Sequence, residues 1–170
     1  MADGMLMGWC RVTIVGSKPQ FYSGVSDGEN WKSRLYERVG LPPPARRGFT
    51  REEGFQPTVT IYNPVSSPHR WHISNLDQLI AVVEHYQIAY SVVDETLLQQ
   101  GLRQNGQAVS NTDVLISPHD EFLVNLMWLS AHATLVELFP ADIFNNRYET
   151  HARALSMSSL FLSPCKIPLS

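Results

Sequence analysis

The chain has 170 residues, which suits one domain of ordinary size and leaves little room for a second. Its hydrophobic fraction of 44% and charged fraction of 17% predict a folded core, because a disordered chain would have fewer apolar residues and more net charge. The net charge of -3 argues against nucleic acid as the main partner, since phosphate backbones bind basic faces. A small anionic ligand held by one local site stays compatible with this composition.

The first 57 residues are expected to form a strand, a helix and a proline-rich connector before the regular part of the chain. The expected segments are a strand at 10–15, a loop at 19–30, a helix at 31–39 and a connector that begins at Pro42. The strand expectation depends on an apolar, β-branched run that ends at Gly16. The helix expectation depends on apolar residues at helical spacing that stop at Gly40.

From residue 58 onward, apolar runs alternate with amphipathic segments. Strands are expected at 58–63, 88–94, 113–118 and 134–139, and helices at 75–86, 121–131 and 140–155, with a short helix or turns at 95–105. Ser74 followed by Asp77 resembles a capping box at the first of these helices. The alternation predicts an α/β fold, a Rossmann-like parallel sheet with helices on both faces, at 58–155. Residues 156–170 fit no element and are expected to be an irregular tail.

Cysteine usage and hydropathy leave the compartment open. Cys10 and Cys165 stand near opposite ends, and two free thiols are favoured over a pairing, although a pairing stays open if the termini meet. No Cys/His spacing has the pattern of a zinc site, so no metal is expected. No apolar run approaches the roughly 20 residues that span a bilayer, so no membrane span is expected in this chain. The acidic start is a poor signal peptide.

Candidate ligand-binding residues lie mostly where parallel strands end, because ligands of such sheets bind outside the carboxyl ends of the strands. His119 follows the strand at 113–118 and precedes a helix, whose free N–H groups and positive dipole end suit a phosphate. A turn histidine that merely caps the helix is the alternative. Asp120 and Glu121 would stabilise the helix start, but they would repel an anion bound there.

Three further polar residues lie at positions that suggest a role in ligand binding or in the fold. Arg70 lies in the loop after the strand at 58–63 and is suited to a bidentate phosphate contact, with a solvated loop arginine as the alternative. Asn125 interrupts an apolar run and needs a partner, in a ligand or in the fold. Glu137 lies inside an apolar strand, where it would accept hydrogen bonds from ribose hydroxyls or face solvent on an edge strand. No nucleophile–base pair can be assigned, so the catalytic residues stay unknown.

The segment SNTDVLISPHDEFLVNLMWLSAHATLVELFP resembles the C-terminal signature of glycosyltransferase family 61. That signature has an apolar strand, His-Gly-Ala-Gly, a short apolar stretch with Asn, a small-residue turn, and an apolar strand that holds Glu and ends near Phe-Pro. The residues in matching places are His119, Asn125, Glu137, Phe139 and Pro140. Upstream, Arg70 and Asn75 match the family's arginine-containing loop and following helix. The resemblance spans about residues 10–155, and 112–140 is its specific part.

The resemblance implies one half of a GT-B fold, the half that holds the nucleotide-sugar. It implies a UDP-linked sugar as donor substrate, a glycan or glycoprotein as acceptor, no bound metal or other cofactor, and a place in the Golgi or endoplasmic reticulum. By the same resemblance, His119 and Arg70 would contact the donor diphosphate. Glu137 would support the nucleoside end or the fold beside it, and Asn125 would brace the loop.

The chain departs from the family pattern at the site itself. Asp120-Glu121-Phe122 replaces the Gly-Ala-Gly that lets the backbone approach the diphosphate, and Asn63 stands where an Arg often follows the strand. The length leaves room for only one GT-B half. Three hypotheses follow. The chain is an active glycosyltransferase that works in a longer or partnered form, a truncated or non-catalytic relative that serves as a binding module, or an unrelated Rossmann-like protein. The spacing of His119, Asn125 and Glu137 disfavours the third. We expect no sugar transfer by the isolated chain, and whether it is an enzyme stays open.

Overall fold

The computed structural model of the chain describes residues 9–15, 25–43, 56–64, 70–140, 145 and 147–164. Within these ranges, the side chains of 9–15, 25–29 and 164 are not described. Several sequence expectations therefore fall outside the described part: the loop at 19–24, the connector beyond Pro43, the helix start at 141–144 and any pairing of Cys10 with Cys165.

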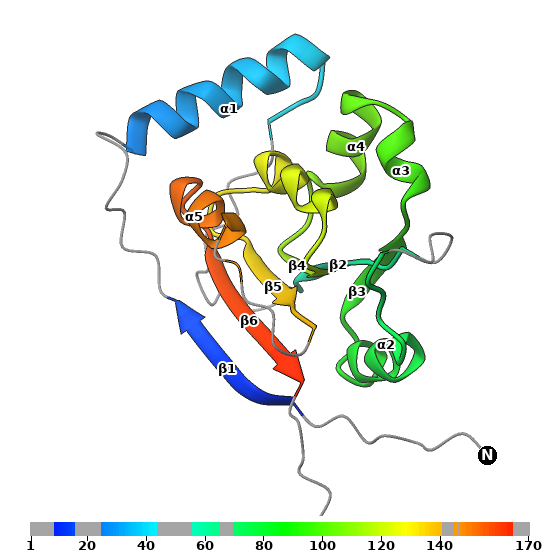
Figure 1. Ribbon diagram of the computed structural model, residues 1–170. Coiled ribbons are helices and arrows are strands. Elements are labelled where there is room, and N and C mark those ends of the chain that lie inside the picture. The colour runs from blue at the N-terminus through cyan, green and yellow to red at the C-terminus, as the bar shows by residue number, and fades with distance from the viewer. Residues whose placement is uncertain are drawn as a thin grey trace, which may run out of the picture.

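The described strands form one six-stranded sheet in the order β1-β6-β5-β4-β2-β3 (Figure 1). The strands are β1 (Trp9–Val15), β2 (Thr58–Tyr62), β3 (Ala89–Val93), β4 (Val114–Pro118), β5 (Thr134–Leu138) and β6 (Ser158–Pro164). Five of them are parallel, and β1 pairs antiparallel with β6 at one edge. The expected α/β, Rossmann-like parallel sheet is thus confirmed, and the N-terminal strand is part of it.

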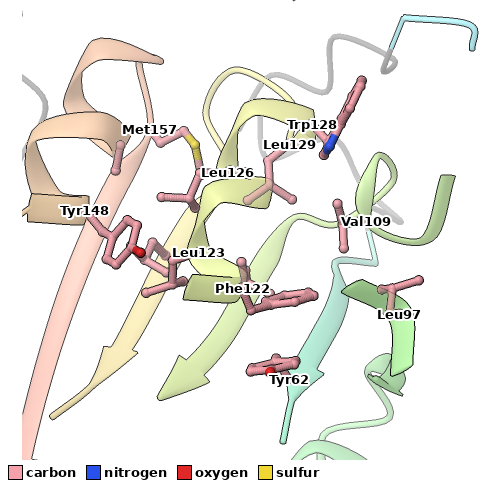
Figure 2. Close-up of a cluster of buried hydrophobic side chains, with 14 of the residues drawn as sticks. Tyr62, Leu97, Val109, Phe122, Leu123, Leu126, Trp128, Leu129, Tyr148 and Met157 are labelled. Atoms are coloured by element: carbon pink, nitrogen blue, oxygen red, sulfur yellow. The ribbon is translucent and has the colours of Figure 1, made fainter. Parts of the chain in front are cut away.

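The helices lie on both faces of the sheet. They are α1 (Val25–Val39), α2 (Leu76–His85), α3 (Thr96–Gln99), α4 (Leu102–Val109), the 3₁₀ helix η1 (Glu121–Trp128) and α5 (Arg147–Ala154). Helix α2 covers β2 on one face, where its apolar side chains pack on Val59 and Ile61. The other helices share the larger core on the opposite face, which includes Leu115 and Leu135. Figure 2 shows this core, with Phe122, Leu126 and Trp128 of η1 among its members. None of the helices in the described part is long and apolar enough to cross a membrane.

Two expectations about the last third of the chain are wrong. The expected irregular tail contains β6, which pairs with β5 and β1 and is therefore inside the sheet. Its pattern is hidden because a serine, Ser159, occupies a buried position beside Phe161. The expected α-helix at 121–131 is the shorter 3₁₀ helix η1. Its period of three turns Glu121 and Val124 outward, while Met127 is partly buried against the core.

The N-terminal boundaries of α1 and α2 also differ from expectation. Helix α1 begins at Val25, inside the segment expected to be a loop. The capping box expected at Ser74 does not form, because Asn75 is the N-cap of α2 and no side chain caps it. Instead, the Asn75 amide donates to Gln78 Oε1 at 3.3 Å. Tyr36 of α1 and Val83 of α2 are buried, whereas Trp31, at the expected start of α1, is 51% exposed.

The strand order creates a switch point between β2 and β4. From β2 the chain passes outward to β3, and it then returns past β2 to β4 and onward to β5 and β6. Right-handed crossovers in these two directions place α2 on one face and the later helices on the other. In open α/β sheets, the crevice at such a switch point is the usual ligand position. The loops that follow β2 and β4 are thus the first place to look for a site.

Candidate functional site

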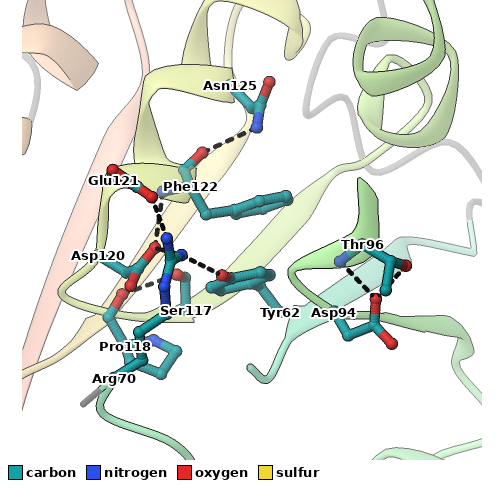
Figure 3. A network of polar contacts seen from close by, with 10 residues as sticks. All are labelled: Tyr62, Arg70, Asp94, Thr96, Ser117, Pro118, Asp120, Glu121, Phe122 and Asn125. Atoms are coloured by element: carbon teal, nitrogen blue, oxygen red, sulfur yellow. Dashed lines mark hydrogen bonds and ion pairs between the residues drawn. The ribbon is translucent and has the colours of Figure 1, made fainter. Parts of the chain in front are cut away.

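A charged cluster from two distant segments occupies the switch point. Arg70, in the segment between β2 and α2, donates to the Tyr62 hydroxyl and to Asp120 Oδ1, each at 3.1 Å. It also forms an ion pair with Glu121. Figure 3 shows the guanidinium among these three partners, above the carboxyl ends of β2 and β4. We refer to Arg70, Tyr62, Asp120 and Glu121 as the Arg70 cluster.

The members of the Arg70 cluster differ in exposure. The Asp120 side chain is 9% exposed, and its Oδ1 also accepts from the Phe122 backbone N–H at 2.9 Å, which caps η1. The Glu121 side chain is 65% exposed, so solvent screens its charge. Burial, and secondarily the charge of Asp120, raise the pKa of Tyr62, which therefore keeps its proton. The charge of Arg70 is thus balanced by two carboxylates, of which solvent screens Glu121 more than Asp120.

Phe122 lies in the core and does not crowd the rim of the site, by which we mean the carboxyl ends of β2, β4 and β5 and the residues that follow them. Its ring stacks on Tyr62 with the centroids 4.0 Å apart and the planes 2° from parallel. It is fully buried. The replacement of Gly-Ala-Gly by Asp120-Glu121-Phe122 therefore adds two carboxylates to the rim, and the aromatic ring of the third residue points inward (Figure 3).

His119 and Glu137 form a pair at the next position along the sheet. The Nδ1 atom of His119 contacts Oε1 of Glu137. Glu137 is fully buried in β5, between Ser117 of β4 and Phe161 of β6. The alternative of a solvent-facing glutamate on an edge strand is therefore wrong. Burial, and secondarily the charge of Glu149, raise the pKa of Glu137, while burial lowers the pKa of His119.

Aromatic rings surround His119 on several sides. Phe139 stacks on the imidazole at a centroid distance of 4.9 Å, Tyr148 meets it edge-on at 5.4 Å, and Trp71 lies at 6.1 Å. The His119 side chain retains 16% exposure. The imidazole is therefore held in a fixed orientation, because Glu137 binds one nitrogen while the rings restrict its rotation.

Asn125 has a structural partner. Its Nδ2 donates to the Phe122 carbonyl at 3.0 Å within η1, and the side chain is 2% exposed (Figure 3). The amide lies inside the core, away from the carboxyl edge of the sheet where Arg70 and His119 stand. This hydrogen bond supports the structural alternative for Asn125. A role in ligand binding stays a prediction.

Two residues that position the site were not predicted to do so. Asn63 accepts from the Ile73 N–H at 2.6 Å and so closes the loop that carries Arg70. Its position directly after β2 was the available signal. Tyr148, on α5, packs against His119, and no sequence pattern marked it as part of the site. Both residues position the site and carry no charge that a ligand would meet.

Within the described residues, no three His, Cys, Asp or Glu side chains come together as metal ligands would. No protein family profile and no curated protein matches the chain. The site thus consists of the Arg70 cluster at the switch point and the His119–Glu137 pair beside it, on a Rossmann-like α/β sheet. Substrate and activity are matters for proposal.

Proposed function

We propose that the chain is the nucleotide-sugar-binding half of a GT-B type glycosyltransferase, and that His119 contacts the donor diphosphate. The signature at 112–140 supports the family, because His119, Asn125 and Glu137 stand at its spacing. The strand order supports the location, since His119 follows β4 beside the switch point. The donor expected from the resemblance is a UDP-linked sugar, and the acceptor is a glycan or glycoprotein.

The observation that carries this proposal is the fully buried Glu137 on the Nδ1 atom of His119. Burying a carboxylate in the middle of a sheet costs folding free energy unless it is paired, and an apolar residue would avoid that cost. Groups with strongly shifted pKa values cluster at functional sites. A histidine oriented by a buried carboxylate at the rim is therefore the best candidate for a ligand contact.

The Arg70 cluster favours weak donor binding. A diphosphate needs unbalanced positive charge, and Arg70 is already paired with Asp120 and Glu121. A ligand must either displace these carboxylates or bind His119 without help from Arg70. We therefore expect donor binding by the chain alone to be modest, and we expect no sugar transfer, because no nucleophile–base pair is assigned among the described residues.

A second candidate function is a non-catalytic binding module of the same fold. The same ion pairs favour it, because an arginine that two carboxylates hold in place is also what a purely structural rim would contain. The two candidates differ in one property: only the first requires that a nucleotide-sugar bind at His119.

Calorimetric titration of the purified chain with UDP and with UDP-N-acetylglucosamine tests the proposal. We expect binding that is lost in His119→Ala and kept in His85→Ala, which removes an exposed histidine of α2 on the other side of the sheet. A matched thermal melt of each variant checks that the fold is intact. Absence of binding at millimolar concentrations of both ligands would favour the non-catalytic module, and measured sugar turnover would overturn our expectation of inactivity.

A further inference from the structure

The His119–Glu137 pair has a property that neither residue has alone. A neutral imidazole carries one N–H, and the partner of one ring nitrogen decides which nitrogen holds it. Here Nδ1 is occupied by Glu137, and Nε2 has no hydrogen-bond partner among the residues that the structure describes. The nitrogen free to meet a ligand is therefore Nε2, and the glutamate sets its state.

We propose that Glu137 is the positioning residue of His119, and that protonation of the pair decides whether Nε2 donates or accepts a hydrogen bond at the rim. The inference rests on the proposed function only for the identity of the ligand, a diphosphate. The property of the pair follows from the contact, the burial and the ring packing alone.

While Glu137 and Nδ1 of His119 share one dissociable proton, Nε2 is always a hydrogen-bond donor. When Glu137 is protonated, it donates to Nδ1, and the imidazole hydrogen sits on Nε2. When that proton moves to Nδ1, the histidine becomes an imidazolium, and Nε2 still carries its hydrogen. When the pair loses the shared proton to solvent, the carboxylate accepts from Nδ1–H, and Nε2 becomes a bare acceptor. Loss of a single proton therefore reverses the polarity of the ligand-facing atom.

The geometry of Glu137 favours the state with the shared proton. Its second oxygen, Oε2, is buried without a hydrogen-bond partner among the described residues. An ionised carboxylate with one oxygen buried and unpaired is costly, so the folded protein favours the protonated pair. The raised pKa of Glu137 agrees with this reasoning and puts proton loss near pH 8.

Charged groups around the pair come from three elements. Asp120, at the start of η1, favours a positive His119, and Arg147 on α5 opposes it. Glu149, also on α5, disfavours an ionised Glu137. Beyond them, Arg70 and Glu121 pair with one another and largely cancel. No single one of these neighbours reverses the effect of burial.

The consequence for an anionic ligand is a loss of affinity at high pH. A phosphate oxygen accepts from Nε2–H but is repelled by a bare Nε2 above a carboxylate. Because one proton is required, affinity falls about tenfold for each pH unit above the pKa of the pair. The diphosphate of a UDP-sugar keeps its charge through this range, and the Glu137→Gln variant separates the contribution of the pair from that of the uracil N3–H, which begins to ionise near pH 9.

Nitrogen-15 NMR of histidine-labelled protein tests the pair without any ligand. The His119 signals are assigned by their absence in His119→Ala. We expect Nε2 to be protonated at pH 6.5 and to lose its proton with a midpoint near pH 8, and we expect Glu137→Gln to abolish that transition. A protonated Nε2 up to pH 9.5, or a transition that Glu137→Gln leaves unchanged, would overturn the proposal.

Glu149→Gln serves as the matched control. It removes a carboxylate that raises the pKa of Glu137 but leaves the pair in place, so the transition should persist at a lower pH. This variant also keeps the proposal testable if Glu137→Gln does not fold. An unchanged midpoint in Glu149→Gln would contradict the assignment of the transition to Glu137.

Titration with UDP-N-acetylglucosamine at pH 7 and 9 separates this inference from the proposed function. We expect binding about tenfold weaker at pH 9 than at pH 7, and Glu137→Gln should remove most of that difference. Binding without pH dependence, together with an unchanged Nε2, would refute the switch and leave the donor site standing. A clear Nε2 transition without binding at either pH would refute the donor site instead.

Discussion

Neutralising the two carboxylates of the Arg70 cluster should have unequal effects on stability. Asp120→Asn and Glu121→Gln each remove one negative charge beside the same guanidinium. Asp120 is 9% exposed and 3.1 Å from Arg70, whereas Glu121 is 65% exposed. Burial should therefore decide which pair matters.

The magnitude follows from the two environments. At an effective dielectric of about 20, a charge pair at 3.1 Å has a gross Coulomb energy of roughly 5 kcal/mol. Desolvation offsets most of it, and Arg70 is 27% exposed and can hydrate when its partner is lost, so we expect Asp120→Asn to cost about 1–2 kcal/mol. Asn retains the oxygen that caps η1. The exposed Glu121 pair should contribute about 0.5 kcal/mol or less.

Urea unfolding at pH 7, followed by tryptophan fluorescence, measures both values. Asp77→Asn, which neutralises an exposed carboxylate in the first turn of α2, is the control for net charge. The cost of Glu121→Gln should vanish in 1 M salt, and that of Asp120→Asn should persist. An equal or larger cost for Glu121→Gln would refute the reasoning, since exposure would then not set the strength of the pair.

Three further predictions concern stability. Between pH 6.5 and 8 the free energy of unfolding should fall by about 1–1.5 kcal/mol, because burial raises the pKa of Glu137 to about 8 and the unfolded chain binds fewer protons in that window. Below pH 6.5 the lowered pKa of His119 makes the free energy of unfolding rise with pH and so opposes the effect of Glu137. Urea midpoints of the wild type and of Glu137→Gln, measured across this pH range, check both effects. Gly106→Ala should lower stability by about 1–2 kcal/mol in a thermal melt, because its methyl group would lie 2.9 Å from Trp128 Cδ2, which outweighs a helix-propensity gain of about 1 kcal/mol. Tyr36→Phe should lower it by about 1–2 kcal/mol in the same assay, because it leaves the Trp128 carbonyl without its hydroxyl donor.

The central strands β2, β4 and β5 could be predicted because burial leaves apolar runs in them. The run at Val114–Pro118 was recognisable as central for this reason. Strand β6 was not predicted because Ser159 fills a buried position, where an apolar residue would have indicated a strand. The 3₁₀ period of η1 was not predicted because the apolar residue Val124 is 47% exposed. Pattern reading fails where a polar residue is buried or an apolar one is exposed.

The candidate site could be predicted residue by residue, but its contacts could not. His119 and Glu137 were both recognisable as out of place, yet their contact depends on the register between β4 and β5, which pairs Ser117 with Glu137. The pairing of Arg70 with Asp120 joins residues 50 positions apart. It follows from the strand order, which brings the ends of β2 and β4 together. Asp120 was therefore interpreted as a charge that stabilises the helix start and repels a ligand, and its pairing with Arg70 was not predicted.

The net charge of the rim controls how strongly the site attracts an anion. Two carboxylates surround Arg70, and the His119–Glu137 pair is neutral while it holds one acid proton, so the rim offers an anion little net attraction. A diphosphate site of this kind can be strengthened from either side, by neutralising Asp120 or by keeping the pair protonated. Asp120→Asn should therefore tighten UDP-sugar binding while it lowers stability. If neither Asp120→Asn nor lower pH increases affinity, the Arg70 cluster is a structural tie between two loops.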